Sequence, residues 1–217
     1  MTGSACCPRC GLNVRPPGRH AAVWECGTHG AVAPVRLYGP VTSADVREAR
    51  RDSDVPVWLP WPSPPEWAVT GLALAGDSDR AARAAAVALT GPAPLGGMAE
   101  MVLVAEEPGT GLGAGYAALD GPDPGTLPGH APDAVVRVGG HAIPLWLLPS
   151  TDDRCVYVGE AMGCWLWVVL WPAEAGVLLL EDLLLLDLRD DLPDEVRFGP
   201  PSPYLRPGSG PDDPPGG

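Results

Sequence analysis

Short apolar runs separated by Gly, Pro and Asp dominate residues 66–198 and predict β-strands. The runs are five to eight residues long and rich in Val, Trp and Leu; they span 100–107, 134–138, 141–148, 154–160 and 164–171. Gly139 and Gly140 predict a two-residue hairpin between the second and third runs, and residues 159–163 predict a longer hairpin loop between the last two.

The run at 164–171 predicts a strand that is buried on both faces. One face carries indoles and the other aliphatic side chains: Trp165, Trp167 and Trp171 against Leu166, Val168 and Leu170. Because neither face is polar, we expect this strand at the centre of a sheet, with its indoles in the core.

Helical patterns are few. Residues 42–52 predict a short helix, with Thr42 or Ser43 as N-cap, Asp45 in the first turn and arginines near the end. Residues 80–90 and 174–190 are ambiguous: the first can be helix or strand, and the second two buried strands or one buried helix. The predicted fold class is α+β, mainly β, with a β-rich domain built of hairpins.

Composition divides the chain into four predicted segments. These are a zinc ribbon at 1–40, a helix plus a Trp/Pro-rich linker at 41–65, the β-rich domain at 66–198 and a disordered tail at 199–217. Gly and Pro occur 28 times each, so we expect short elements joined by tight turns.

The N-terminal segment carries two pairs of metal-ligand residues. Cys7 and Cys10 form Cys-Pro-Arg-Cys-Gly, and Cys26 and His29 form Cys-Gly-Thr-His-Gly. This spacing lets two side chains reach one ion from a tight turn, and the glycine after each pair admits a left-handed residue. Four protein ligands complete a tetrahedral zinc ion and leave no position for water, so the predicted zinc is structural.

Other interpretations of the cysteines remain open. Cys6 can replace Cys7 as a ligand, and His20 can replace His29, although both lie outside the paired spacing. A redox Cys-x-x-Cys motif needs a preceding strand, for which Cys7 lies too near the start. Cys155 and Cys164 would be several residue pairs apart in a hairpin, so we expect two buried thiols.

Charge constrains the partners. The net charge is −13; residues 1–40 carry +3, which leaves −16 for residues 41–217. Nucleic acid can therefore bind only through residues 1–40, and a protein partner is expected instead. Lysine is absent, which excludes a P-loop lysine and a Schiff base.

The first residues, MTGSACC, lack the apolar stretch of a signal peptide, and the densest apolar run, at 164–171, is too short to cross a bilayer. We therefore expect a soluble protein in a reducing cytoplasm.

Candidate ligand-binding residues outside the zinc motif are few. The Trp/Pro-rich segment contributes Trp58 and Trp61, and the strand at 100–107 contributes Glu100 and Glu106. The glycine-rich stretch 109–115 has dinucleotide-like spacing, but it follows two glutamates and lacks room for a long helix, so it predicts a flexible turn. No motif assigns a catalytic residue.

The stretches CPRCG, WECGTHG, PVWLPWPSPPEW and DDRCVYVGEAMGCWLWVVLWP, in this order, resemble an uncharacterised family of actinobacterial proteins described as a domain of unknown function. The resemblance spans residues 6–191 and implies an actinobacterial source and no established activity. Some relatives carry a phosphotransacetylase label; such enzymes are α/β proteins with longer catalytic regions, and this chain shows no repeated strand–helix units.

Two hypotheses of function follow. The first is a non-enzymatic binding or regulatory module whose zinc ribbon docks a protein. The alternative is a small-molecule binder or enzyme with a pocket formed by the Trp/Pro-rich segment, the turn at 94–100 and Glu100.

Overall fold

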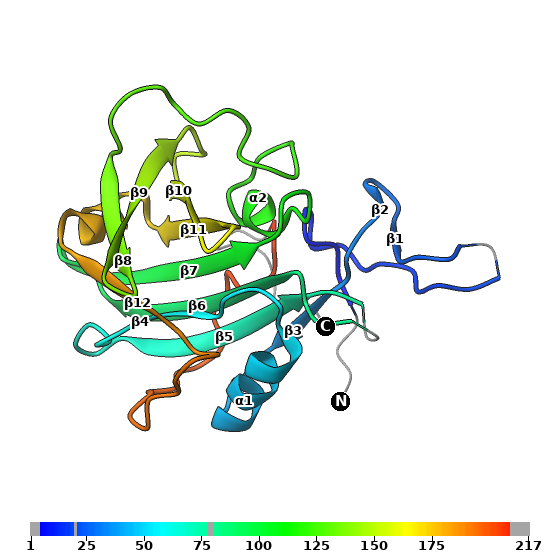
Figure 1. The fold of residues 1–217 in the computed structure, drawn as a ribbon, viewed down its shortest axis with the longest axis horizontal. Helices are drawn as coiled ribbons and strands as arrows, with labels where there is room; N and C mark the ends of the chain where they lie inside the picture. Colours follow the sequence, from blue (N-terminus) through cyan, green and yellow to red (C-terminus); the bar gives the residue numbers. More distant parts are fainter. Residues whose placement is uncertain (1–4, 20, 78–79, 209–217) are drawn as a thin grey trace.

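The computed structural model describes residues 5–19, 21–77 and 80–208 and confirms a mainly β fold (Figure 1). A ten-stranded sheet forms the body, and a two-stranded hairpin, β1 (Glu25–Cys26) and β2 (Gly30–Ala31), lies beside it. In spatial order the large sheet contains β3 (Val35–Tyr38), β5 (Ala68–Ala75), β6 (Ala84–Pro92), β7 (Met98–Glu106), β11 (Cys164–Trp171), β10 (Cys155–Ala161), β9 (His141–Leu148), β8 (Ala134–Val138), β12 (Leu183–Asp187) and β4 (Trp58–Pro60).

Most neighbouring strands are antiparallel, and only β12 pairs with β8 in parallel. Both predicted hairpins are present: Val138 pairs with His141 around Gly139 and Gly140, and Ala161 pairs with Cys164. Strand β11 lies between β7 and β10, which confirms its central position.

The sheet curls around its main core. Strand β4, at one end of the sheet order, contacts β6 and β7 near the middle without pairing with them. The enclosed core contains Trp58, Leu72, Leu103, Leu166 and Leu185. This core buries the aliphatic face of β11, as its alternation predicts.

A second core covers the opposite face of the central strands. It contains the buried Trp167 and Trp171, together with Cys6, Tyr116 and Leu205. The short helix α2 (Leu112–Tyr116) contributes to this cover, so the second core joins distant parts of the chain.

Helix α1 (Ser43–Asp52) matches its prediction. The Thr42 hydroxyl accepts the Asp45 N–H, and the Asp45 carboxylate accepts the Thr42 N–H, which completes a capping box. Val46 and Ala49 bury one side of the helix against the main core.

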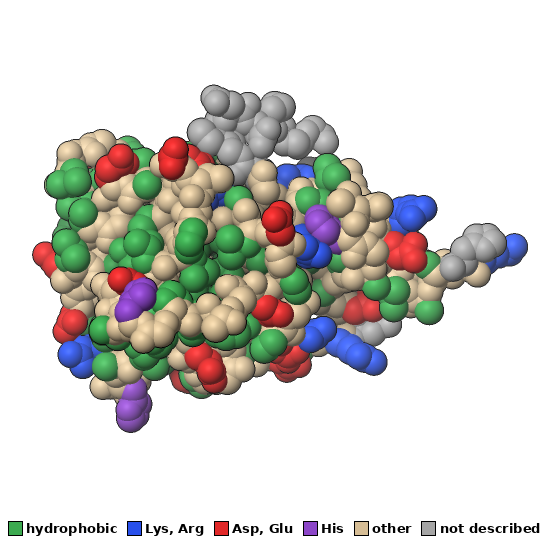
Figure 2. Space-filling model, turned by 90° about the horizontal axis from the view of Figure 1, so that it is seen from above, with side chains coloured by type: hydrophobic (Ala, Val, Ile, Leu, Met, Phe, Trp, Pro, Cys, Tyr) green, Lys and Arg blue, Asp and Glu red, His purple; other side chains and the backbone are tan. Residues whose placement is uncertain are grey.

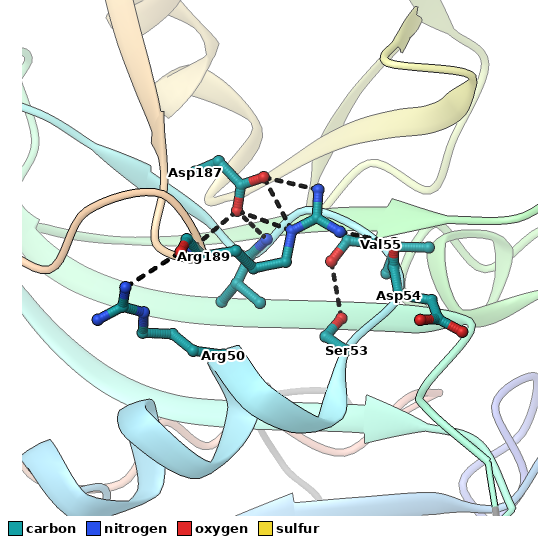
Figure 3. A network of polar contacts seen from close by, with 7 residues as sticks. Arg50, Ser53, Asp54, Val55, Asp187 and Arg189 are labelled. Carbon is teal, nitrogen blue, oxygen red and sulfur yellow. Dashed lines mark hydrogen bonds and ion pairs between the residues drawn. The ribbon is translucent and has the colours of Figure 1, made fainter.

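Strand β12 is connected to α1 and β4 by an ion pair between the buried Asp187 and the partly buried Arg189 (Figure 3). The Asp187 carboxylate accepts hydrogen bonds from the Arg189 guanidinium, at 2.7 Å to Nη2, and from the Val57 N–H at 3.1 Å. Arg189 donates to the Asp54 carbonyl, and Arg50 at the end of α1 donates to the Arg189 carbonyl. These contacts hold together the end of α1, the residues just before β4 and the end of β12.

The structure resolves the two ambiguous segments. The alanine-rich stretch is strand β6, whose first five residues, at 84–88, are buried. Small side chains suit this position because both faces of the strand pack against other elements, and packing overrides the helix propensity of alanine. The second segment is neither two strands nor one α-helix: it is a 3₁₀ helix, η1 (Ala173–Leu180), followed by strand β12.

Strands of the sheet come from three of the four predicted segments. Strand β3, from the segment predicted as zinc ribbon, pairs with β5, and β4, from the predicted linker, pairs with β12. Strand β5 itself, with the sequence AVTGLALA, is not among the runs that predict strands.

The segment at 199–208 differs from the predicted disorder. Leu205 is buried, and the Tyr204 ring stacks on Trp171 with centroids 4.6 Å apart. The Tyr116 hydroxyl donates to the Leu205 carbonyl over 2.6 Å. Composition alone suggested a tail because the apolar residues here are sparse; these few side chains fill gaps in the second core. Residues 209–217 of the predicted tail lie outside the described residues.

Candidate metal centre

Two tight turns position the predicted metal ligands. In the first knuckle (residues 7–11), the Gly11 N–H donates to the Cys7 carbonyl over 2.9 Å, and Gly11 has a φ of 66°. The second knuckle (residues 26–30) closes the β1–β2 hairpin, in which Cys26 pairs with Gly30, whose φ is 68°. Glycine adopts this left-handed backbone without steric cost, as the sequence analysis expected.

The four predicted ligand side chains converge. The ligand atoms of Cys7, Cys10, Cys26 and His29 all lie within 4.8 Å of one another. The His29 Nδ1 lies 3.5 Å from the Cys7 Sγ and 3.7 Å from the Cys26 Sγ, which is 3.7 Å from the Cys10 Sγ. Bonds of about 2.3 Å to sulfur and about 2.0 Å to nitrogen give tetrahedral ligand separations of about 3.5–3.8 Å. The cluster therefore fits a four-coordinate metal ion.

Backbone N–H groups point at the first sulfur of each knuckle. Cys7 accepts hydrogen bonds from the backbone of Arg9 and Cys10, and Cys26 accepts them from Thr28 and His29. Burial still raises the pKa of Cys7 to about 12. Burial opposes ionisation of Cys26 too, but its hydrogen bonds lower its pKa to about 6. Because a metal ion binds the thiolate, these N–H groups favour the form that coordinates.

The remaining cysteines lie apart from this cluster. Cys6 is fully buried in the second core, and burial raises the pKa of its thiol to about 11. Cys155 pairs with Leu170 and Cys164 with Ala161, so the two are separated along the hairpin and remain free thiols; Cys164 is buried as predicted, whereas Cys155 is only partly buried. His20, the other alternative ligand, lies outside the described residues.

Helix α2 packs directly against the first knuckle. A Cβ atom at Gly115 would lie 2.1 Å from the Pro8 carbonyl oxygen, so only glycine permits this approach. The Arg9 guanidinium donates to the Asp120 carbonyl just beyond the helix. The glycine-rich stretch thus forms a contact surface for the knuckle, where the sequence analysis expected a flexible turn.

The segment after β12 closes the other side of the knuckle. The Arg206 guanidinium donates to the Gly11 carbonyl over 2.7 Å, and the Gly208 N–H donates to the Gly115 carbonyl over 3.2 Å. No motif in the sequence predicts that Arg206 and Gly208 contact the metal cluster's surroundings. The glycines at 109–115 carried a signal of close backbone approach, whereas Arg206 carried no signal because it lies in a stretch of low complexity.

Glu106 holds α2 in place from the sheet. Its side chain is fully buried, and its Oε2 accepts the Leu112 N–H over 2.7 Å. Burial raises the pKa of this carboxyl to about 7, against the opposing effect of the N–H groups of Leu112 and Gly113. A buried carboxyl in the main sheet is thus linked through α2 to the metal cluster.

The four candidate ligand-binding residues do not form one pocket. Trp58 is buried in the main core, and Glu100 accepts a hydrogen bond from the Ser202 hydroxyl over 2.8 Å. Glu100 and Glu106 lie six residues apart on β7, which separates them by about 20 Å along the strand. Trp61 borders a hollow of about 370 Å³, lined by Trp61, Pro62, Ser63, Pro64, Pro65, Trp67, Glu195 and Arg197.

The described residues contain no helix that is both long and apolar enough to span a membrane. Taken together, the curled sheet and the Cys₃His cluster define a mainly β protein with an N-terminal site able to hold a metal ion.

A family model covers residues 1–205, and the chain belongs to this family, which is described as a family of unknown function (DUF6758). Searches among curated proteins and among solved structures find no match.

Proposed function

We propose that the cluster of Cys7, Cys10, Cys26 and His29 holds one structural zinc ion. We further propose that the protein is a binding module and that this ion stabilises its N-terminal arm, the segment at 1–40 predicted as a zinc ribbon. The observation that carries the zinc assignment is the convergence of four ligand atoms within 4.8 Å of one another, with three of their separations at 3.5–3.7 Å, which suits tetrahedral sulfur and nitrogen coordination. With four protein ligands, such a site has no open position for a reacting water.

The N-terminal arm has few large apolar side chains that could stabilise it by burial, which supports the assignment of a bound ion. Two of its apolar side chains are exposed to solvent: Leu12 is 59% and Val23 48% accessible. Zinc at such sites contributes on the order of 10–16 kcal/mol of apparent binding free energy, which becomes folding free energy. Thiolate coordination and free thiols also suit a reducing compartment such as the cytoplasm.

The proposed binding surface is the cleft between the zinc-held hairpin and the sheet. This cleft has a volume of about 720 Å³ and is lined by Ala22, Val23, Trp24, Ala31, Val32, Ala33, Pro34, Asp54, Gly76, Asp77, Arg80, Ala81, Arg83 and Glu107. One wall is apolar and comes from the arm; the other carries charged side chains from the body. An extended segment of a partner protein suits such mixed walls.

Charge favours a protein over a nucleic acid as the partner. Figure 2 shows basic side chains gathered at the end of the molecule that the N-terminal arm forms, with acidic side chains over the body. Two of the four arginines in residues 1–40 are already engaged: Arg9 with the Asp120 carbonyl and Arg15 with Glu25. Among the residues that the structure describes, only Arg15 is paired with a carboxylate, so at most three arginines of this segment offer an unpaired charge to phosphates, against the net charge of −16 on residues 41–217.

Metal analysis tests the first part of the proposal. The full chain, purified without added metal, is expected to contain one zinc per chain by plasma mass spectrometry, and Cys26→Ser is expected to lose most of it. Cys164→Ser, which changes a cysteine outside the cluster, serves as the control and keeps the zinc. A wild-type protein without zinc that stays folded in a chelator contradicts the assignment.

Quantitative capture tests the second part. Proteins bound by the full chain under native conditions are compared by mass spectrometry with those bound by Val23→Asp, which places a charge on the apolar wall of the cleft. Leu95→Asp is the matched control, because Leu95 is 71% exposed and lies outside the cleft. A partner that Val23→Asp loses and Leu95→Asp keeps supports the cleft; a partner kept equally by both rules it out.

A further inference from the structure

A second hollow is lined in part by residues of β8, β9 and β12, strands that lie side by side in the sheet (Figure 1). Its volume is about 450 Å³, and it is lined by Val138, Gly139, His141, Ile143, Ala161, Met162, Leu185, Leu186, Asp187 and Asp190. None of these residues lines the cleft beside the zinc arm, so this hollow is a separate site.

The strand register places the hollow. Strands β9 and β10 pair over only three positions, from Val156 with Leu148 to Val158 with Trp146. Beyond that point, Ile143 on β9 and Met162 in the β10–β11 turn face the hollow from two sides. The hollow thus lies where the ladder between the two strands has ended, against the main core.

The walls of the hollow are mostly aliphatic. Val138, Ile143 and Leu186 are partly buried and pack against the main core, while Leu185 is buried. Met162 is 61% exposed at the rim. Methionine is flexible and polarisable, so its side chain can adapt to the shape of an apolar ligand.

The charge at one end of the hollow is negative. Asp187 contributes little to it, since its carboxylate is paired with the Arg189 guanidinium (Figure 3). Asp190 is exposed, and its carboxylate makes no ion pair with any residue that the structure describes. Within the part of the chain that the structure describes, the lining contains no arginine, and its imidazole belongs to His141. A ligand in this site therefore meets one unneutralised carboxylate beside an apolar wall.

We propose that this hollow binds a small amphiphilic cation, with its apolar part against Ile143, Leu185 and Leu186 and its ammonium group at Asp190. The volume lies within the range of about 300–1,000 Å³ that is common for small-molecule sites. The net charge of −13 adds a long-range attraction for cations. This site is independent of the zinc cluster and of the partner cleft.

Calorimetry with three matched probes tests the proposal on the full chain at pH 7.5. Octylammonium, octanol and octanoate share one alkyl chain and differ in the charge of the head group. Octylammonium is expected to bind at one saturable site roughly fivefold more tightly than octanol, because a partly exposed ion pair contributes about 1 kcal/mol, and octanoate is expected not to bind. Equal affinity for octylammonium and octanol, or no saturable binding, overturns the proposal.

Charge variants locate the head group. Asp190→Asn is expected to remove the preference for octylammonium over octanol, whereas Asp191→Asn, which removes the same charge from an exposed neighbour outside the hollow, is expected to keep it. If both variants reduce the preference equally, the effect comes from overall charge, and the assignment to Asp190 is wrong.

Space-filling variants locate the apolar part. Ile143→Trp is expected to abolish binding of all probes, and Ala142→Trp, on the neighbouring position of the same strand, is expected to leave it intact. If these variants do not fold, an NMR measurement on the wild-type protein still tests the proposal. Met162 lines the hollow, so its ¹³C-methyl resonance is expected to shift when octylammonium is added. The exposed Met98 is the internal control, and shifts at Met98 without shifts at Met162 overturn the proposal.

Discussion

Replacing Glu106 by glutamine is expected to change how stability depends on pH. The buried carboxyl accepts the Leu112 N–H, and burial raises its pKa from an ordinary value of 4.5 to about 7. The folded state therefore holds this proton more tightly than the unfolded state does. The stabilisation that comes from this bound proton is complete below pH 4.5 and is lost as the pH rises towards 7. Above pH 7 the free energy of unfolding no longer changes through this group.

The size of the effect follows from the pKa. At about 1.4 kcal/mol for each pKa unit, the wild type loses about 3 kcal/mol of unfolding free energy across this interval. Glutamine keeps a carbonyl oxygen for the Leu112 N–H and cannot ionise. We therefore expect Glu106→Gln to gain about 3 kcal/mol relative to the wild type between pH 4.5 and pH 8.

Urea unfolding of both proteins at a series of pH values measures this difference, and any pH dependence of the metal site cancels because it is common to both. Glu107→Gln is the control, since Glu107 is partly exposed and pairs with Arg83 at the surface; its difference from the wild type should stay nearly constant. If the difference in unfolding free energy between Glu106→Gln and the wild type does not change with pH, or decreases as the pH rises, the reasoning is refuted.

Three further substitutions test how the arm, the sheet and the last described segment are joined. Gly115→Ala should destabilise the protein by about 1–3 kcal/mol and accelerate zinc transfer to a chromogenic chelator, because the new Cβ meets the first knuckle; Gly129→Ala, in open space, should do neither. Asp187→Asn should cost about 2–3 kcal/mol in urea unfolding because it leaves the partly buried Arg189 guanidinium without its carboxylate partner, whereas Asp182→Asn, which breaks an exposed ion pair, should cost less than about 1 kcal/mol; equal costs would contradict the structural role of the Asp187–Arg189 pair. Leu205→Ala should lower the thermal midpoint by several degrees, since the side chain is buried in the second core; an unchanged midpoint would favour the disorder predicted from composition.

Local patterns were sufficient for several parts of the structure. The alternation of Trp167 and Val168 placed β11 between two cores, and Gly139 with Gly140 predicted a hairpin from two neighbouring residues. The metal cluster was also predictable. Each knuckle forms within a few residues, so the spacing of Cys7 and Cys10, and of Cys26 and His29, already encodes its geometry.

Other parts depended on contacts between distant residues. The alanine-rich stretch 84–88 favours helix locally, but β5 and β7 on either side select a strand with small side chains. The contacts of Arg206 with Gly11 and of Gly115 with Pro8 join residues far apart along the chain, and no local pattern specifies such pairs.

The sequence by itself therefore determined the strands of the central hairpins, helix α1 and the four residues that form the candidate metal centre, because periodicity, capping and ligand spacing act within a few residues. The tertiary structure alone decided that strands of the first two predicted segments join the same sheet as the β-rich domain. It also decided that the buried Glu106 holds helix α2, which packs through Gly115 against the candidate metal centre. The physical reason is that burial and close packing depend on which distant surfaces meet, and those contacts are made only when the sheet has curled.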